Sequence, residues 1–233
     1  MIRNLFFSVF FYLGIILICL IFLPSFFLPK KIVLFGGKIM GYWSKFCLEF
    51  FLSTKIIIKG RENIVSNEKF FIACTHQSMF ETFYLQTLFN SPVFILKKEL
   101  LSIPIFGWYL KKIESISIDR NKINKENLYF YEKIKSSMAS TNRPIIIFPQ
   151  ATRVAVDDRS QFKKGALRIY ENLNIKCQPV AINSGSIWPK SGPLIPNRIL
   201  TISILEPIEA GMDSKKFLEV LQNSIYKELD SIS

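Results

Sequence analysis

His76 is the only histidine in this chain of 233 residues, and Glu81 follows it within the segment THQSMFET. Imidazole titrates near neutral pH and often serves as a general base. A carboxylate that accepts a hydrogen bond from the imidazole fixes its tautomer and stabilises the imidazolium. On one straight helix the two side chains would point about 140° apart. We therefore expect His76 just before a helix, folded back onto Glu81.

Glu81 also has a purely structural interpretation. Ser78 and Glu81 form the pattern S-x-x-E, a capping box in which the Glu side chain accepts a hydrogen bond from the backbone N–H that begins a helix. A lone histidine at the end of a strand is likewise often a hydrogen-bonded structural residue. The sequence leaves both roles of Glu81 open.

Cationic side chains follow other apolar segments. Lys97 follows VFIL, Arg120 follows SISID, and Arg153 ends the run PQATR after IIIF. Arginine forms bidentate bonds to phosphate, and lysine adds a point charge. The chain contains no G-x-x-x-x-G-K-[ST] loop, no G-x-G-x-x-G segment and no G-x-S-x-G elbow, which disfavours nucleotide hydrolysis and serine-esterase chemistry.

Seven short segments rich in β-branched and aromatic residues are expected to be buried strands. They are 56–58, 70–74, 93–96, 116–118, 145–148, 179–182 and 199–205. The spacing predicts helices over 77–89, 124–138, 161–172 and 214–229. This alternation predicts an α/β domain over residues 53–233, with a largely parallel sheet flanked by helices. Because ligands bind beyond the carboxyl ends of parallel strands, the polar residues are expected to share one site.

Residues 1–52 are expected to form a membrane-anchoring helical segment. Residues 5–28 are uncharged, and a helix of that length would reach roughly 36 Å, enough for the hydrocarbon core of a bilayer. Pro24 and Pro29 then predict a break. Residues 32–52 mix apolar side chains with lysines and a glutamate, as in a helix at the membrane interface. Whether the first helix crosses the bilayer or enters one leaflet stays open.

The net charge of +12 suits an anionic partner. The apolar N-terminus and the lack of a nucleic-acid-binding motif favour a membrane surface over nucleic acid. The four cysteines lie far apart and only one histidine is present, so we expect no metal site and no disulfide framework. A reducing, cytosolic setting for the catalytic domain follows.

Four ordered blocks resemble the phospholipid and glycerol acyltransferase family, most closely its bacterial 1-acyl-sn-glycerol-3-phosphate acyltransferases. The blocks are 76–81, similar to H-x-x-x-x-D; SISIDR at 115–120, similar to a block ending in F-I-D-R; FPQATR at 148–153, similar to F-P-E-G-T-R; and PVAIN at 179–183, similar to V-P-V-a-I. FKKGA at 162–166 and LKKEL at 96–100 also match family stretches. The resemblance covers roughly residues 55–206.

The resemblance implies transfer of a fatty acyl group from a coenzyme A or acyl carrier protein thioester to the free hydroxyl of lysophosphatidic acid, giving phosphatidic acid. It implies no cofactor and no acyl-enzyme, with His76 as the base and Glu81 orienting its ring. Four residues would bind the acceptor phosphate: Arg153, Arg120, Lys97 and Thr152. The catalytic domain would lie on the cytosolic side of the inner (cytoplasmic) membrane.

Three positions depart from the family pattern: Glu81 replaces Asp, Gln150 replaces Glu, and Ala151 replaces Gly. Ala151 matters most, because a glycine there can occupy a positive-φ position that alanine resists. Two alternatives stay open. The same residues could acylate glycerol 3-phosphate or another lysophospholipid, or the chain could be a non-catalytic relative that binds lipid.

Overall fold

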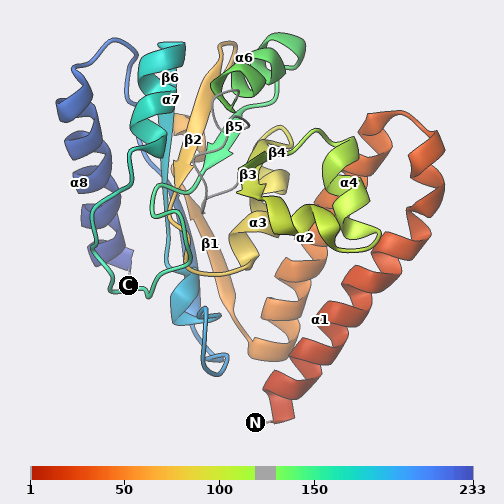
Figure 1. The fold of residues 1–233 in the computed structure, drawn as a ribbon. Helices are drawn as coiled ribbons and strands as arrows, with labels where there is room; N and C mark the ends of the chain where they lie inside the picture. The colour runs from red at the N-terminus through yellow and green to blue at the C-terminus, as the bar shows by residue number, and fades with distance from the viewer. Residues whose placement is uncertain (1, 119–129, 233) are drawn as a thin grey trace.

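A seven-stranded sheet forms the centre of the computed structural model, which describes residues 2–118 and 130–232 (Figure 1). The strands are β1 (Lys55–Lys59), β2 (Phe70–Cys74), β3 (Val93–Lys97), β4 (Ile116–Ile118), β5 (Ile145–Ile147), β6 (Lys176–Ile182) and β7 (Ile199–Ile204). Each predicted strand is confirmed, with ends that differ by at most a few residues. The sheet order is β1-β7-β6-β2-β5-β3-β4.

The sheet is parallel except between β6 and β7. The carboxyl ends of β2, β5, β3 and β4 therefore lie along one edge, as the sequence predicted. All five residues of β2 are buried, because helices cover both faces of the sheet. Phe71 and Ala73 pack into the core on one face, whereas Ile72 and Cys74 pack into the core on the other. This two-sided burial explains the unbroken apolar run FFIAC.

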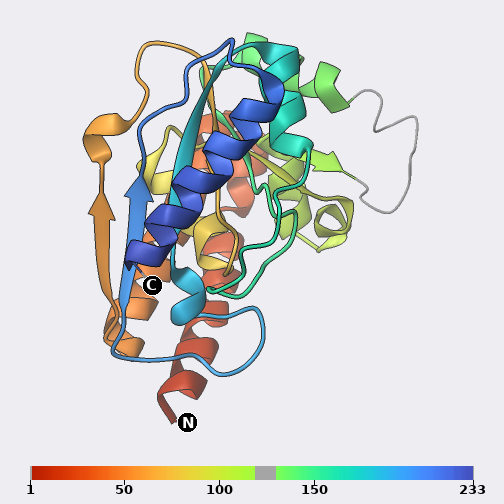
Figure 2. The same ribbon diagram turned by 90° about the vertical axis from the view of Figure 1, so that its left-hand side faces the viewer.

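Four of the predicted helices are present in whole or in part: α3 (Phe80–Leu88), α6 (Phe130–Ser140), α7 (Gly165–Leu173) and α8 (Ser214–Ile232). The predicted start of α6 at 124 lies outside the described residues. Helix α8 crosses the face of the sheet that is packed against α6 and α7 (Figure 2). A further helix, α4 (Phe106–Lys112), follows the 3-10 turn η3 (Lys98–Ser102) and was not predicted.

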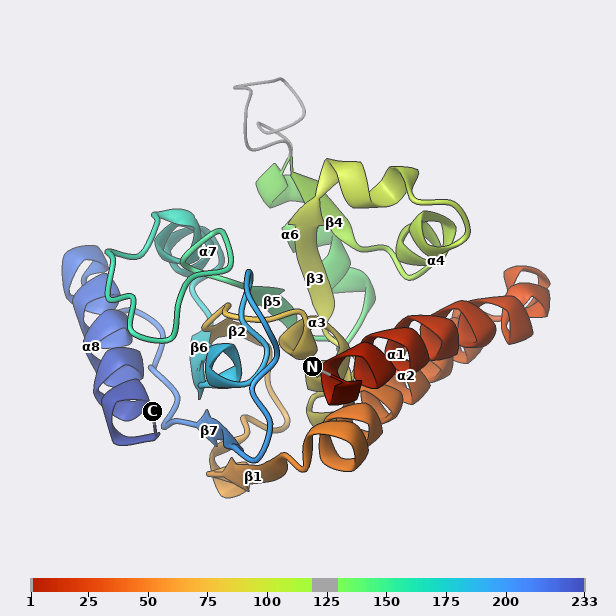
Figure 3. The ribbon, with the colours of Figure 1, turned by 90° about the horizontal axis from the view of Figure 1, so that it is seen from below.

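The N-terminal residues form a helical hairpin on the α3 side of the sheet (Figure 3). Helix α1 (Ile2–Ile21) and helix α2 (Lys30–Leu52) are joined by the 3-10 turn η1 (Leu23–Phe27), so the break predicted at the two prolines is confirmed. Among the described residues, α1 is the one helix long and apolar enough to cross a membrane, with a mean hydropathy of 2.5. Helix α2 packs on α3, which places this hairpin beside the segment that carries His76.

The two helices of the hairpin approach closely at Gly14. A Cβ atom there would lie 2.1 Å from Nε1 of Trp43, so only glycine fits without a shift. The Trp43 Nε1–H donates a hydrogen bond to the carbonyl oxygen of Phe11 at 3.2 Å. The N-terminal end of α1 is fastened to the end of α2, because Arg3 donates to the carbonyl oxygen of Phe51 and to the hydroxyl of Ser53, the residue after α2, both at 2.8 Å.

Candidate active site

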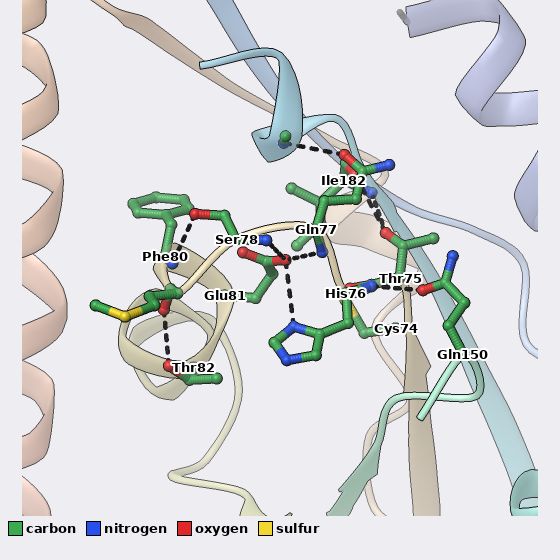
Figure 4. A network of polar contacts seen from close by, with 12 residues as sticks. Cys74, Thr75, His76, Gln77, Ser78, Phe80, Glu81, Thr82, Gln150 and Ile182 are labelled. Carbon is green, nitrogen blue, oxygen red and sulfur yellow. Dashed lines mark hydrogen bonds and ion pairs between the residues drawn. The ribbon is translucent and has the colours of Figure 1, made fainter. Parts of the chain in front are cut away.

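The segment between β2 and α3 is fixed by hydrogen bonds to the end of β6 and the turn that follows it (Figure 4). The Thr75 hydroxyl oxygen accepts from the Ile182 N–H at 2.8 Å, and the Thr75 N–H donates to the Val180 carbonyl at 3.1 Å. The buried Gln77 side chain accepts from the Gly185 N–H at 3.0 Å. These bonds hold the residues on both sides of His76, so its backbone position is set by the sheet.

His76 folds back onto Glu81, as predicted. Nδ1 of His76 lies 3.6 Å from Oε1 of Glu81, a distance typical of an ion pair and longer than a hydrogen bond. The Glu81 side chain is fully buried, whereas the His76 side chain keeps 16% of its surface exposed. The imidazole stacks on the Phe148 ring with centroids 4.1 Å apart. Its other nitrogen, Nε2, points away from Glu81 (Figure 4).

Glu81 performs the capping role as well. Its Oε1 accepts from the backbone N–H of Gln77 at 2.7 Å and of Ser78 at 2.8 Å. The Ser78 hydroxyl accepts from the Phe80 N–H at 3.2 Å at the start of α3. The two interpretations that the sequence left open are therefore compatible. The helix start fixes the carboxylate that faces the imidazole.

The loop after β5 binds both backbone polar groups of His76. Gln150 Oε1 accepts from the His76 N–H at 2.7 Å, and the Val154 N–H donates to the His76 carbonyl at 2.9 Å. Thr152 and Arg153 lie between these two contacts, on the loop that is hydrogen-bonded to the backbone of the candidate base. The Lys163 N–H donates to the Pro149 carbonyl at 2.9 Å, which joins the FKKGA segment to the same loop.

Ala151 in this loop has a φ angle of 61°. This is the left-handed region, where the Cβ atom crowds the backbone and glycine is favoured. The position at which the family pattern has glycine thus requires the conformation that glycine supplies, and alanine adopts it here at a cost.

A cavity of about 300 Å³ lies next to this loop and is bordered by α1. Its lining residues are Phe7, Ser8, Tyr12, Met79, Arg153, Trp188, Pro189, Lys190, Gly192 and Leu194. The Lys190 ammonium donates to the Thr152 hydroxyl at 3.5 Å. Within residues 2–118 and 130–232, no carboxylate forms an ion pair with Arg153 or Lys190. The cavity therefore presents two cations that have no counterion in the part of the chain that the structure describes.

Lys97, another predicted phosphate ligand, is not among the residues that line this cavity. Lys97 is exposed at the end of β3, which is separated from β2 by β5. Arg120 lies outside the described residues. Lys190, in contrast, was missed by sequence reasoning. It follows β6 in the run NSGSIWPK, so its place after another strand was the signal that could have found it.

Comparisons with known proteins agree with the motifs. The family model described as Acyltransferase matches residues 55–183, more than half of the chain. The chain is 35% identical over 135 residues to the 1-acyl-sn-glycerol-3-phosphate acyltransferase of Pseudomonas aeruginosa, covering 58% of this chain and 52% of that protein. It is also 35% identical over 161 residues to the protein of the same name from Helicobacter pylori, covering 67% of each. The chain thus spans about half to two thirds of the length of these relatives.

The fold is similar to a solved structure, the 1-acyl-sn-glycerophosphate (LPA) acyltransferase PlsC from Thermotoga maritima. The TM-score is 0.78 at 19% identity, over 100% of this chain and 98% of that one, so the similarity includes the N-terminal hairpin. The segment that matches the family model runs from β1 through β6 and contains His76, Glu81 and Arg153. This chain therefore belongs to the acyltransferase family.

Proposed function

We propose that this chain is a membrane-bound acyltransferase that moves a fatty acyl group from an acyl thioester to the free hydroxyl of lysophosphatidic acid, giving phosphatidic acid. The observation that carries the proposal is the pairing of a base with an anion site. His76 faces a buried carboxylate, and its backbone is hydrogen-bonded to the loop that carries Arg153, which has no counterion among the described residues. The names of the relatives support the same acceptor.

In the proposed reaction, Nε2 of His76 takes the proton of the acceptor hydroxyl while the hydroxyl oxygen attacks the thioester carbonyl carbon. The carboxylate of Glu81 stabilises the imidazolium that forms. The carbon–sulfur bond of the tetrahedral intermediate then breaks, and the imidazolium returns its proton to the departing thiolate. The products are an ester and a free thiol. The acyl group is never attached to the protein, and a general base of this kind contributes roughly 10²–10⁴ in rate.

The membrane part of the proposal rests on α1. This helix exposes a row of large apolar side chains, among them Leu5, Val9, Leu13, Ile16 and Leu20. Ser8 and Tyr12 of the same helix line the cavity. The acyl chain of a lysophospholipid can then stay in the bilayer while its headgroup enters the cavity. The net charge of +12 would hold the catalytic domain against the anionic cytosolic face of a membrane.

Acceptor and donor assays on membranes that carry the protein test this function. Lysophosphatidic acid, glycerol 3-phosphate and lysophosphatidylcholine are offered side by side, each with acyl-coenzyme A and with acyl carrier protein thioester. The proposal predicts phosphatidic acid from lysophosphatidic acid with at least one donor, above membranes that lack the protein. Lack of phosphatidic acid with both donors would overturn it, and faster acylation of another acceptor would reassign the substrate.

A further inference from the structure

The loop from the turn η4 (Ser184–Ser186) to β7 carries Lys190 and lies beside the N-terminal end of α1 (Figure 3). The Trp188 ring makes edge-to-face contacts with Phe7 and Phe11 of α1, with centroids 5.1 Å and 4.9 Å apart. On the other side of Lys190, the Asn4 side chain donates to the Leu194 carbonyl at 2.9 Å. The backbone that carries Lys190 is therefore held by α1 at two points.

The Ile195 N–H donates to the Ile187 carbonyl at 2.9 Å, which closes this loop at its base. The Asn197 N–H donates to the Leu52 carbonyl at 2.8 Å and fastens the end of the loop to α2. A lysine on a free loop would swing through solvent, whereas this one starts from a fixed backbone. Its ammonium reaches the hydroxyl of Thr152, the residue next to Arg153.

Arg153 and Lys190 thus line one cavity from two separate loops, one after β5 and one after β6. Lys190 is exposed and Arg153 is half-buried, so water screens part of the repulsion between their charges, and among the described residues neither has a carboxylate as an ion-pair partner. An anionic group bound between them would remove the repulsion and gain charge-assisted hydrogen bonds from both. The arrangement is that of a site for a ligand with more than one negative charge.

We propose that Lys190 is a specificity-determining residue that, together with Arg153 and Thr152, selects a phosphomonoester acceptor over a phosphodiester one. This inference rests on the proposed function, since it places the acceptor headgroup in this cavity. A phosphomonoester carries a charge of about −1.5 to −2 at pH 7 and has three free oxygens. A phosphodiester has a single negative charge, and a substituent occupies one of those oxygens. Lys190 therefore contributes more to the first ligand than to the second.

The cavity that Lys190 lines is small. Its volume of about 300 Å³ is at the low end of the range for ligand pockets. Tyr12 of α1 and Pro189 form part of its wall.

The test is a binding measurement on the full chain in detergent, by titration calorimetry with two probes. One probe is hexanoyl lysophosphatidic acid, a phosphomonoester, and the other is hexanoyl lysophosphatidylglycerol, a phosphodiester. Lys190→Gln is expected to weaken binding of the first about tenfold or more, the loss expected for one charge-assisted hydrogen bond, and of the second by less than about threefold. Lys190→Arg keeps the charge and is expected to keep the preference.

The matched control is Lys216→Gln, an exposed lysine on α8, which packs on the opposite face of the sheet. It removes the same charge from the molecule and is expected to change neither affinity. Equal weakening of both probes by Lys190→Gln, no weakening of either, or a wild-type protein that does not bind the phosphomonoester would each overturn the inference. Binding is measured without an acyl donor, so a protein that shows the preference but forms no phosphatidic acid would refute the proposed function and leave this inference standing.

Discussion

Oε1 of Glu81 lies 3.6 Å from Nδ1 of His76 and at the same time accepts hydrogen bonds from the backbone N–H groups of Gln77 and Ser78. The same oxygen atom thus accepts from the backbone N–H groups just before helix α3 and faces the candidate base. The carboxylate is fully buried, so water cannot replace it as the acceptor of these two N–H groups. If the side chain turned away, both donors would be left unpaired. The position of the imidazole is in this way tied to the start of the helix.

Glu81→Gln is expected to lower kcat by about 100-fold while the protein stays folded. The amide oxygen can still accept from the two backbone donors, but the negative charge that stabilises the imidazolium is lost. The loss in the free energy of unfolding should be about 1–3 kcal/mol, because hydrogen bonds to a charged group are replaced by neutral ones. Turnover and chemical denaturation measure the two effects.

Glu81→Ala is the companion variant. It removes the acceptor as well as the charge, so its free energy of unfolding should fall further than that of Glu81→Gln. Wild-type turnover by a folded Glu81→Gln protein would mean that Glu81 serves only as a helix cap.

Gln150 is expected to position the base through its backbone. Its Oε1 accepts from the His76 N–H at 2.7 Å, and the side chain is buried. Gln150→Leu leaves that donor without a partner, which costs about 1–3 kcal/mol of stability and should lower kcat with little change in KM. Gln150→Glu supplies a carboxylate oxygen in the same place and should retain more turnover. If Leu and Glu at this position gave the same kcat, the hydrogen bond would have no part in positioning His76.

Ala151→Gly is expected to stabilise the protein. Ala151 has a φ angle of 61°, where removal of the Cβ atom relieves roughly 1 kcal/mol of strain. For a chain of this size the melting temperature should rise by about 2–4 °C. The control is Ala155→Gly in the same loop, which is not among the positive-φ residues and should give no rise. A lower melting temperature for Ala151→Gly than for the wild type would contradict the claim that the backbone at Ala151 is strained.

The reaction is expected to proceed without a cysteine of the protein as nucleophile. Cys74 ends β2 only two residues before His76, but burial raises the pKa of its thiol well above the usual range, and Glu81 adds to this effect. Burial does the same to Cys177 in β6. Thiolates are the reactive form, so N-ethylmaleimide at pH 7 should label these cysteines only as the protein unfolds and should leave turnover unchanged. Rapid labelling of Cys74 in folded protein together with loss of turnover would contradict a reaction without an acyl-enzyme.

The sheet was predictable from the sequence because each strand is a short run of apolar, β-branched or aromatic residues. FFIAC is apolar throughout since both of its faces are covered, and turn-forming residues bound it. Helix α4 has no such pattern. It is seven residues long, too short to show a helical period, and long-range contacts place it: the Tyr109 hydroxyl donates to the Cys19 carbonyl at 2.8 Å, and its ring stacks on Phe26.

At the site, too, local features were predictable from the sequence and long-range contacts were not. The contact between His76 and Glu81 was predictable because the two residues are close in sequence, and the strain at Ala151 because it replaces a family glycine. The wall that Ser8 and Tyr12 contribute was not predictable, since it arises only when α1 docks on the loop of Trp188. Lys190 follows a strand, which is a signal that the sequence does carry, but its partner in the fold is not readable from the sequence. Its role depends on a tertiary contact with Thr152.

The most direct test of the central claim, that His76 is the base, is acylation of lysophosphatidic acid by membranes that carry His76→Ala. The surrounding loop binds His76 through its backbone N–H and carbonyl, so the variant keeps those bonds and should fold. The account predicts a fall in kcat of at least about 100-fold, with a KM for lysophosphatidic acid close to that of the wild type. Turnover by His76→Ala at the wild-type rate would contradict it.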